Sequence, residues 1–213
     1  MMTIKKFEFN MLPVNCYVLS DETKEAVIID AGCYYTDEQQ ALKNYIESNG
    51  LTLKHLICTH LHFDHIFGNP FVLRTFGIKA EANPKDMPWM ANIKQRISIF
   101  GLSTCDDPVP LGRELEEGDE VTFGTHTLKA LAVPGHSPGS LAFYCEEEKV
   151  VFTGDALFAG SIGRADFIDG DESLLIRSVK EKLLTLPDET VVLTGHGEKT
   201  TIGNEKRFNI FLR

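Results

Sequence analysis

The segment Thr59–His65 carries side chains that could bind metal ions. Its sequence, THLHFDH, contains His60, His62, Asp64 and His65, and neutral imidazole and carboxylate groups bind zinc or iron at neutral pH. On an extended segment His60 and His62 point to the same side, so one ion can contact both. Asp64 and His65 follow where the chain turns toward a helix, and they are free to face a second ion. The segment therefore predicts a metal site with room for two ions.

A simpler interpretation gives these residues no ligand role, because a single histidine is usually a surface residue or a satisfied core residue. A cluster is different. Three neutral rings and an unpaired carboxylate at the end of a buried strand would be costly to desolvate without a partner. A metal ion is such a partner, so the cluster favours metal binding.

Length and composition predict a single domain over residues 1–213. The chain is 43% hydrophobic and 24% charged, which is typical of a soluble globular protein. Its formal net charge of −10 argues against a broad surface for nucleic acid or anionic membranes, so we expect neither partner.

The N-terminus and the cysteines indicate a cytoplasmic protein. Residues 1–15 mix charged and apolar side chains, so they form neither a signal peptide nor a membrane span. The 5 cysteines are odd in number and contain no C-x-x-C pair, which is typical of reduced, buried thiols.

Four apolar runs each end near a polar residue that could take part in chemistry, namely Asp30, His60, Asp155 and His196. Runs without alternation suggest strands buried on both faces, and therefore sheets covered by helices. Functional groups at the ends of such strands would converge along one edge of the sheets. The predicted strands are Ile4–Phe9, Cys16–Ser20, Ala26–Ile29, Leu56–Thr59, Val121–Phe123, Leu128–Val133, Leu141–Cys145, Val150–Thr153 and Thr190–Leu193.

Two helices are predicted between these strands. Thr36 and Gln39 have the spacing of a capping box, and the helix that they open has Leu42, Tyr45 and Ile46 on its apolar face and stops at Gly50. A second helix runs from about Ser173 until Pro187 ends it, with an apolar face made of Leu175, Val179, Leu183 and Leu186.

Three further candidates lie in turn-rich loops after predicted strands: His136 in PGHSPG, Asp155 in GDALF and His196 in TGHG. Each signal alone is weak, because a polar loop residue commonly bonds to the backbone. Glycine beside Asp155 and His196 would let the backbone approach closely.

In this order, the set H-x-H-x-D-H, then H, D and H, resembles the metallo-β-lactamase superfamily. The motifs extend from Asp30 to Gly197, which is almost the whole chain. The resemblance implies an α/β fold, a four-layer αββα sandwich, with the metals along one edge. It also implies that His60, His62 and His136 bind a first metal, that Asp64, His65 and His196 bind a second, and that Asp155 bridges the two. Asp30 looks like the family's structural aspartate, which lies behind the ligands.

Within the superfamily, the chain is most similar to the glyoxalase II-like group, the hydroxyacylglutathione hydrolases. It looks like the short bacterial members that carry G-R-x-D-F after the bridging aspartate, here residues 163–167. The resemblance implies a member without the C-terminal helical domain that holds glutathione in the full-length enzymes. Of the family's glutathione contacts near the metals, Arg164 keeps a basic group, whereas Asp166 and Glu198 stand where tyrosines are expected.

The resemblance implies a metal-dependent hydrolase of small-molecule thioesters. Two divalent ions, with zinc expected and iron or manganese as alternatives, would bring the pKa of bound water to about 7. Metal-bound hydroxide would attack the thioester carbonyl, with Asp64 and Asp155 as the catalytic carboxylates, and the thiolate would leave without a strong general acid.

The segment 83–113 permits two interpretations. Met90, Ile93, Ile97 and Phe100 have helical spacing, which usually serves a core. The other interpretation is an apolar flap over the metals, in which Trp89, the single tryptophan, and Phe100 contact the substrate.

Other functions remain open. Persulfide dioxygenases resemble the chain in the same motifs and bind one iron, which here would take His60, His136 and Asp155. Lactone or β-lactam hydrolysis could use the same metals, and the missing signal peptide counts against a secreted β-lactamase. Nuclease activity is disfavoured by the acidic charge. A structural zinc site would usually contain cysteines, and none matches a ligand position here. The sequence leaves the oligomeric state open.

Overall fold

The first sheet is built from the N-terminal half of the chain. A computed structural model describes all residues except 92, 100, 103–104 and 167. The first three strands pair antiparallel, and from the third strand to the sixth the pairing is parallel. In sheet order the strands are β1 (Thr3–Phe9), β2 (Val14–Ser20), β3 (Glu25–Ile29), β4 (Thr52–Ile57), β5 (Ala80–Ala82) and β6 (Arg113–Glu114).

The second sheet comes from the C-terminal half. Its pairing is antiparallel except between β10 and β13, which run parallel. Two short strands, β11 (Leu157–Phe158) and β12 (Ser161–Ile162), form a separate hairpin. In sheet order the second sheet contains β14 (Thr200–Thr201), β13 (Val191–Thr194), β10 (Val150–Gly154), β9 (Leu141–Cys145), β8 (His126–Ala132) and β7 (Glu120–Phe123).

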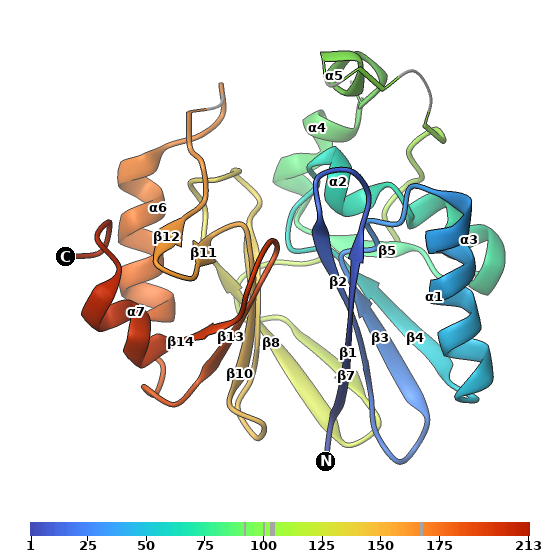
Figure 1. Ribbon diagram of the computed structural model, residues 1–213, viewed down its shortest axis with the longest axis horizontal. Coiled ribbons are helices and arrows are strands. Elements are labelled where there is room, and N and C mark those ends of the chain that lie inside the picture. Colours follow the sequence, from blue (N-terminus) through green and yellow to red (C-terminus); the bar gives the residue numbers. More distant parts are fainter. Residues whose placement is uncertain (92, 100, 103–104, 167) are drawn as a thin grey trace.

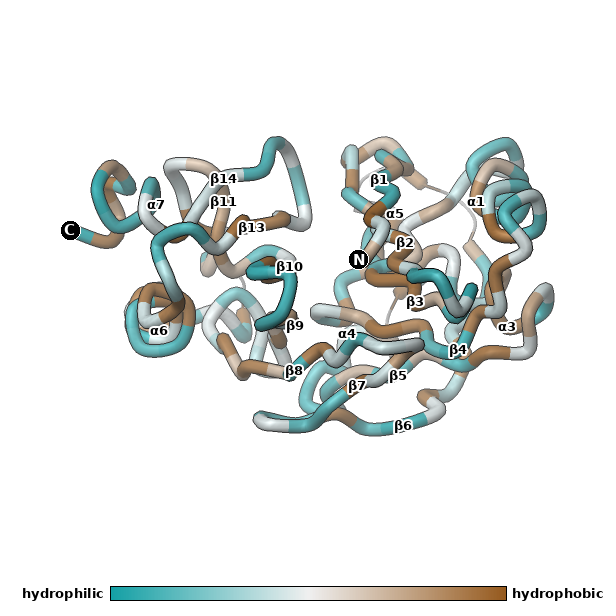
Figure 2. The backbone as a smooth tube through the Cα atoms, turned by 90° about the horizontal axis from the view of Figure 1, so that it is seen from below, coloured by the Kyte–Doolittle hydropathy of each residue, from teal (hydrophilic) through white to brown (hydrophobic). Residues whose placement is uncertain are grey.

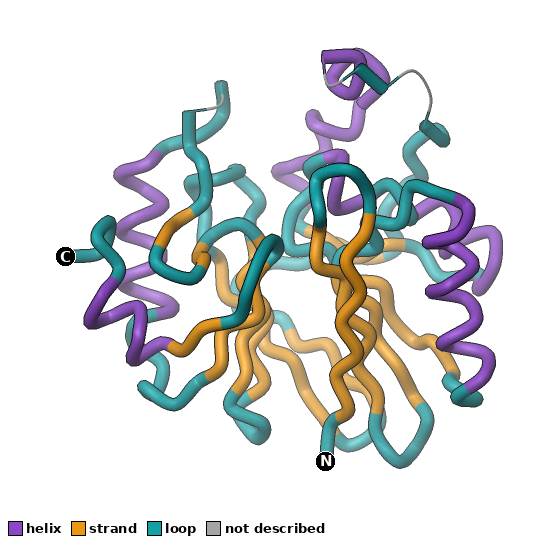
Figure 3. Tube along the Cα trace, in the orientation of Figure 1, coloured by secondary structure: helices purple, strands orange, loops and turns teal. Residues whose placement is uncertain are grey.

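Helices cover the outer faces of both sheets (Figures 1 and 3). On the first sheet these are α1 (Thr36–Ser48) and α3 (Asn69–Phe76). On the second they are α6 (Glu172–Ser178), which continues as a π-helix over Val179–Leu183, and α7 (Ile202–Phe208). Among the described residues, no helix has both the length and the apolar character to cross a bilayer. Three short helices and a 3₁₀ turn lie at the loop end of the sheets: α2 (Phe63–Ile66), Pro84–Asp86, α4 (Met87–Ala91) and α5 (Ile93–Ile99).

Three apolar cores separate the four layers. In β3, Ala26 and Ile28 pack into the core shared with α1, whereas Val27 and Ile29 pack into the core between the sheets. In β10, Val151 packs toward α6 in the third core. Figure 2 shows the matching apolar stretches along the strands. The apolar runs in β3, β4 and β10 are therefore buried on both faces, as predicted, whereas Val191 and Leu193 of β13 are only half-buried. The predicted four-layer αββα sandwich is confirmed.

Two predicted helix starts need correction. Tyr35, rather than Thr36, is the N-cap of α1, and Glu38, rather than Gln39, closes the turn by accepting the backbone N–H groups of Tyr35 (3.0 Å) and Tyr34 (2.8 Å). A carboxylate binds these donors more strongly than an amide does, which favours Glu38. The second helix begins one residue earlier than predicted, at Glu172, because the Asp171 carboxylate caps it by accepting the N–H of Leu174 at 2.8 Å.

Candidate metal centre

All seven predicted ligands gather where strands of both sheets end. His60 and His62 follow β4, Asp64 and His65 lie on α2, and His136, Asp155 and His196 follow β8, β10 and β13. Each residue belongs to a group whose possible ligand atoms lie within 4.8 Å of one another. The groups are His60, His62 and His136; His60, His65 and Asp155; and Asp64, His65 and His196.

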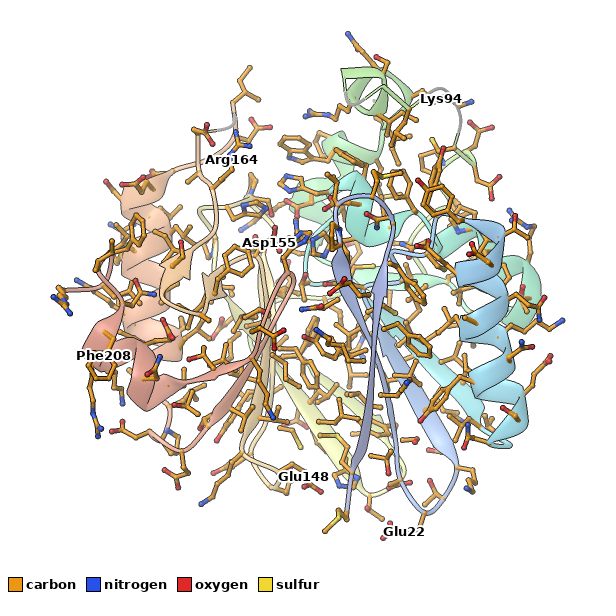
Figure 4. The ribbon with its side chains drawn as sticks, viewed as in Figure 1. Glu22, Lys94, Glu148, Asp155, Arg164 and Phe208 are labelled. Atoms are coloured by element: carbon orange, nitrogen blue, oxygen red, sulfur yellow. The ribbon has the colours of Figure 1, made fainter. Side chains whose placement is uncertain are left out.

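Asp155 lies between the two predicted ligand sets. Its Oδ2 atom is 3.6 Å from His136 Nε2 and 3.5 Å from His196 Nε2, and its Oδ1 atom is 3.4 Å from His65 Nε2. Figure 4 shows this side chain at the loop end, between the two halves of the molecule. Asp155 therefore reaches members of both sets.

Hydrogen bonds on the outer side fix the orientation of three of the histidine rings. His65 Nδ1 donates to Asp30 Oδ2 at 3.0 Å, and His136 Nδ1 donates to the backbone carbonyl of Arg164 at 2.6 Å. His196 Nδ1 donates to the Pro13 carbonyl at 3.1 Å. A donor at Nδ1 leaves the lone pair of Nε2 directed at the centre, which is the tautomer a metal ligand needs.

Asp30 lies behind the centre, where the resemblance placed it. It is buried and has a positive φ of 55°, which turns the chain sharply after β3. Its carboxylate also accepts the Thr59 N–H and the Thr59 hydroxyl, both at 2.7 Å. Asp30 thus fixes both the start of the histidine segment and the ring of His65.

Burial and nearby charges divide the histidines into two kinds. Burial lowers the pKa of His60 well below its usual value, and it lowers the pKa of His62 to about 3. Burial also acts to lower the pKa of His65, but Asp155, Asp64 and Asp30 together outweigh it and raise that pKa. His60 and His62 are therefore neutral at pH 7 and can donate a lone pair.

The arrangement fits divalent cations. Among the described residues, the buried Nε2 atom of His60 has no hydrogen-bond partner. An unsatisfied buried polar atom costs about 1–3 kcal/mol, and a cation would remove that cost. Imidazole nitrogens together with the carboxylates of Asp64 and Asp155 form a donor set that suits zinc or iron.

Asp86 is a residue at this centre that the sequence analysis missed. It is fully buried. Its Oδ2 atom accepts the Leu61 N–H at 3.3 Å and the Ser137 hydroxyl at 2.7 Å, and its Oδ1 atom accepts the Gly139 N–H at 2.7 Å. Asp86 therefore ties the His60–His62 loop to the His136 loop. No local pattern marks it, because Leu61 and Ser137 are 25 and 51 residues away in the chain.

A cleft of about 620 Å³ opens above the predicted ligands. The predicted substrate residue Trp89 lines it, and its ring centroid is 4.3 Å from that of His62. Arg164, also predicted, lines it as well (Figure 4). Phe100 lies outside the described residues, as does Phe167 of the G-R-x-D-F motif. The other lining residues are Leu12, His62, Phe63, Asp64, Arg96, His136, Asp155, Phe158, Ile168 and His196.

Both interpretations of the segment 83–113 have support in the structure. Ile93 and Ile97 are buried in the core beneath α5, as expected of a packed helix. Trp89, from the neighbouring α4, faces the cleft instead. A role of Trp89 in substrate binding stays a prediction.

Residues 10–196 match the family model of the metallo-beta-lactamase superfamily. The chain belongs to this superfamily. It is 40% identical to the hydroxyacylglutathione hydrolase GloC of Haemophilus influenzae over 93% of the chain and 92% of that protein. It is 33% identical to the human mitochondrial persulfide dioxygenase ETHE1 over 86% of the chain and 65% of that protein.

Two solved structures show the same fold. The BLEG-1 B3 metallo-beta-lactamase superposes with a TM-score of 0.89 at 38% identity, covering 99% of both chains. TTHA1623 in a di-iron-bound form superposes with a TM-score of 0.87 at 36% identity, covering 98% of this chain and 100% of that chain. The similar lengths agree with a short member of the superfamily.

Proposed function

We propose that the protein is a metal-dependent hydrolase that cleaves thioesters of the hydroxyacylglutathione type. The observation that carries the proposal is that all seven predicted ligands lie together, with Asp155 within 3.6 Å of histidines from both predicted sets. The similarity to GloC over 93% of the chain supports the thioester as substrate. Zinc is the expected metal, and the di-iron form of a relative makes iron the first alternative.

The chain's own residues would have distinct roles. His60, His62 and His136 would hold one cation, Asp64, His65 and His196 the other, and Asp155 would contact both. Bound divalent cations would lower the pKa of water toward neutrality and polarise a carbonyl oxygen. The carboxylates of Asp64 and Asp155 face the cleft and can accept a hydrogen bond from the attacking water. Phe63 and Trp89 supply apolar walls, and the thiolate leaves without a proton donor.

A persulfide dioxygenase is the second candidate. The 33% identity to the human enzyme supports it, and so does the proximity of His60, His136 and Asp155, the residues that would hold a single iron. A single iron would leave Asp64, His65 and His196 without a metal. Because these three residues also form a group of possible ligands, they favour the hydrolase. The similarity to BLEG-1 keeps lactone or β-lactam hydrolysis as a further use of the same groups.

One experiment separates these functions. Metals are quantified in protein purified without added metal, and the protein is assayed with a thioester panel, a lactone, a β-lactam and, by oxygen uptake, glutathione persulfide. We expect about two metal ions per chain and thioester turnover. Oxygen consumption with one iron would support the dioxygenase instead.

Variants test the ligand assignment. His136→Ala and Asp155→Ala should each lose bound metal and about 100-fold or more of the turnover while keeping native circular dichroism. His55→Gln, which removes a histidine paired with Glu81 outside the cleft, is the control and should keep both. Full turnover without metal would refute the proposal.

A further inference from the structure

Arg96 lies on α5 and lines the cleft above the candidate metal centre. Its guanidinium carbon is 3.4 Å from the centroid of the Trp89 ring, and that ring contacts His62. A guanidinium stacked on an aromatic ring uses its face for the contact and keeps its N–H groups available at the edge. The stack therefore fixes a rigid hydrogen-bond donor in the wall of the cleft.

The positive charge of Arg96 has no carboxylate partner within the described part of the chain, and its Nε atom is buried there without a hydrogen-bond partner. Residues 92, 100 and 103–104, the undescribed positions nearest to it in sequence, are Asn, Phe, Ser and Thr, and residue 167 is Phe, so none could supply a carboxylate. Two other basic residues, one in the cleft lining and one on the same helix, are paired with carboxylates. Arg164 makes two 3.0 Å bonds to Asp166, and Lys94, on the same helix, lies 2.6 Å from Asp107.

An unneutralised guanidinium in this chain is notable because acids outnumber bases, 31 to 21. Arginine binds carboxylates through paired, charge-assisted hydrogen bonds. Apart from the predicted ligands and the paired Arg164, the other residues that line the cleft are apolar, including Leu12, Phe63, Phe158 and the 90% exposed Ile168. The cleft thus offers an apolar wall, one free cationic group and the candidate metal centre.

We propose that Arg96 binds a carboxylate of the substrate, so that the enzyme prefers thioesters that carry a free carboxylate at a distance from the reacting carbonyl. The proposal rests on the proposed function and names its substrate class: a thioester that carries a carboxylate away from the reacting carbonyl. Arg96 is then a specificity-determining residue that comes from the segment between β5 and β6.

Matched substrates test it on the metal-loaded protein. One pair is the acetyl thioesters of 3-mercaptopropionate and 3-mercaptopropionamide, and the other is the S-ethyl thioesters of glutarate and glutaramate. Arg96→Gln should lower kcat/KM for the carboxylate member of one pair by about tenfold or more, and for its amide by less than about twofold. The pair that responds shows whether the thiol side or the acyl side carries the carboxylate.

Lys94→Gln is the matched control, because it removes the same charge from the same helix outside the cleft lining. It should leave all four rates unchanged, and the metal content should be equal in both variants. An equal loss on the amide and the carboxylate, or no loss on either, would overturn the role of Arg96. Arg96→Lys keeps the charge and should retain part of the preference for the carboxylate thioester over the amide. If Arg96→Gln does not fold, Arg96→Lys takes its place in the comparison.

A binding measurement separates failure of this inference from failure of the proposed function. Trp89 is the single tryptophan, so its fluorescence reports on the Arg96 stack. Hexanoate should bind the wild type and should bind Arg96→Gln at least about fivefold more weakly, whereas hexanamide should bind both equally. If none of the four thioesters is cleaved but hexanoate still distinguishes the proteins, the hydrolase proposal fails and the carboxylate site stands. Equal binding of hexanoate to both proteins, or no binding, refutes the carboxylate site.

Discussion

At the scale of single residues, the hydrogen bonds that a histidine ring makes away from the candidate metal centre determine which of its nitrogen atoms can bind a metal. Asp30 holds the Nδ1 atom of His65, and the Arg164 carbonyl holds that of His136, so in both rings Nε2 faces the centre. Asp86 acts on the loops that carry the histidines rather than on their rings. It accepts hydrogen bonds from backbone N–H groups of these loops and from the Ser137 hydroxyl. It is a positioning residue, and removing it would leave its donors buried without an acceptor.

Asp86→Ala should therefore destabilise the protein by about 3 kcal/mol and weaken metal binding about tenfold or more, because its donors lose their acceptor and the two histidine loops separate. Urea unfolding and competition with a chromogenic chelator measure the two effects. Asp106→Ala, which removes an exposed carboxylate paired with Arg74, should cost less than about 1 kcal/mol and leave metal binding unchanged. Unchanged metal affinity in Asp86→Ala would show that the loops keep their positions without it.

At the scale of elements, the parallel pairing of β10 and β13 places the end of one strand beside the end of the other. Gly154 is in register with Thr194, so Asp155 and Gly195 follow as neighbours. A Cβ atom on Gly195 would lie 2.2 Å from Asp155 Oδ1 and 2.9 Å from His65 Cε1. Glycine is therefore needed here for close approach, since only a hydrogen fits beside the carboxylate.

Gly195→Ala should displace the Asp155 carboxylate and lower metal occupancy and turnover by about tenfold or more. Metal analysis and kcat measure this. Gly50→Ala is the control: Gly50 has a φ of +63° after α1, and an added Cβ meets nothing within 4 Å. It should cost about 1 kcal/mol or more of stability through backbone strain and leave the metal content unchanged. Normal occupancy in Gly195→Ala would contradict the close-approach argument.

At the scale of the whole molecule, the candidate centre joins the two halves. His60, His62, Asp64 and His65 come from the segment that follows β4 of the first sheet, whereas His136, Asp155 and His196 come from loops of the second. Apart from the apolar core between the sheets, a bound cation would be a second link between the halves. Metal binding would then stabilise the entire fold rather than one loop.

Removal of the metal should lower the melting temperature. A ligand that binds only the folded state at 1,000 times its Kd contributes about 4 kcal/mol, and the gain depends on metal concentration. Calorimetry of the chelated protein titrated with zinc measures it. Magnesium, which prefers octahedral oxygen ligands, should give little shift. A melting temperature that zinc does not change would argue against a site that spans both halves.

Local features could be predicted from the sequence: the histidine and carboxylate spacing in residues 59–65, and the apolar runs that form strands, of which those in β3, β4 and β10 are buried on both faces. These features follow from the periodicity of side chains along a strand or helix, which neighbouring residues set. The motif order also led to the four-layer sandwich. The boundaries were less predictable, because the cap of α1 depends on which carboxylate reaches the free N–H groups.

Which distant groups meet could not be predicted from the sequence and depends on how the elements pack. The tertiary structure placed Asp155 between two sets of histidines, put Asp86 behind two loops, and paired Arg164 with Asp166 while Arg96 kept its charge free of carboxylates among the described residues. Strand register and helix packing set these contacts across long stretches of chain. Local spacing carries no information about such partners, since any of several carboxylates could have neutralised Arg96 in a different packing of the same elements.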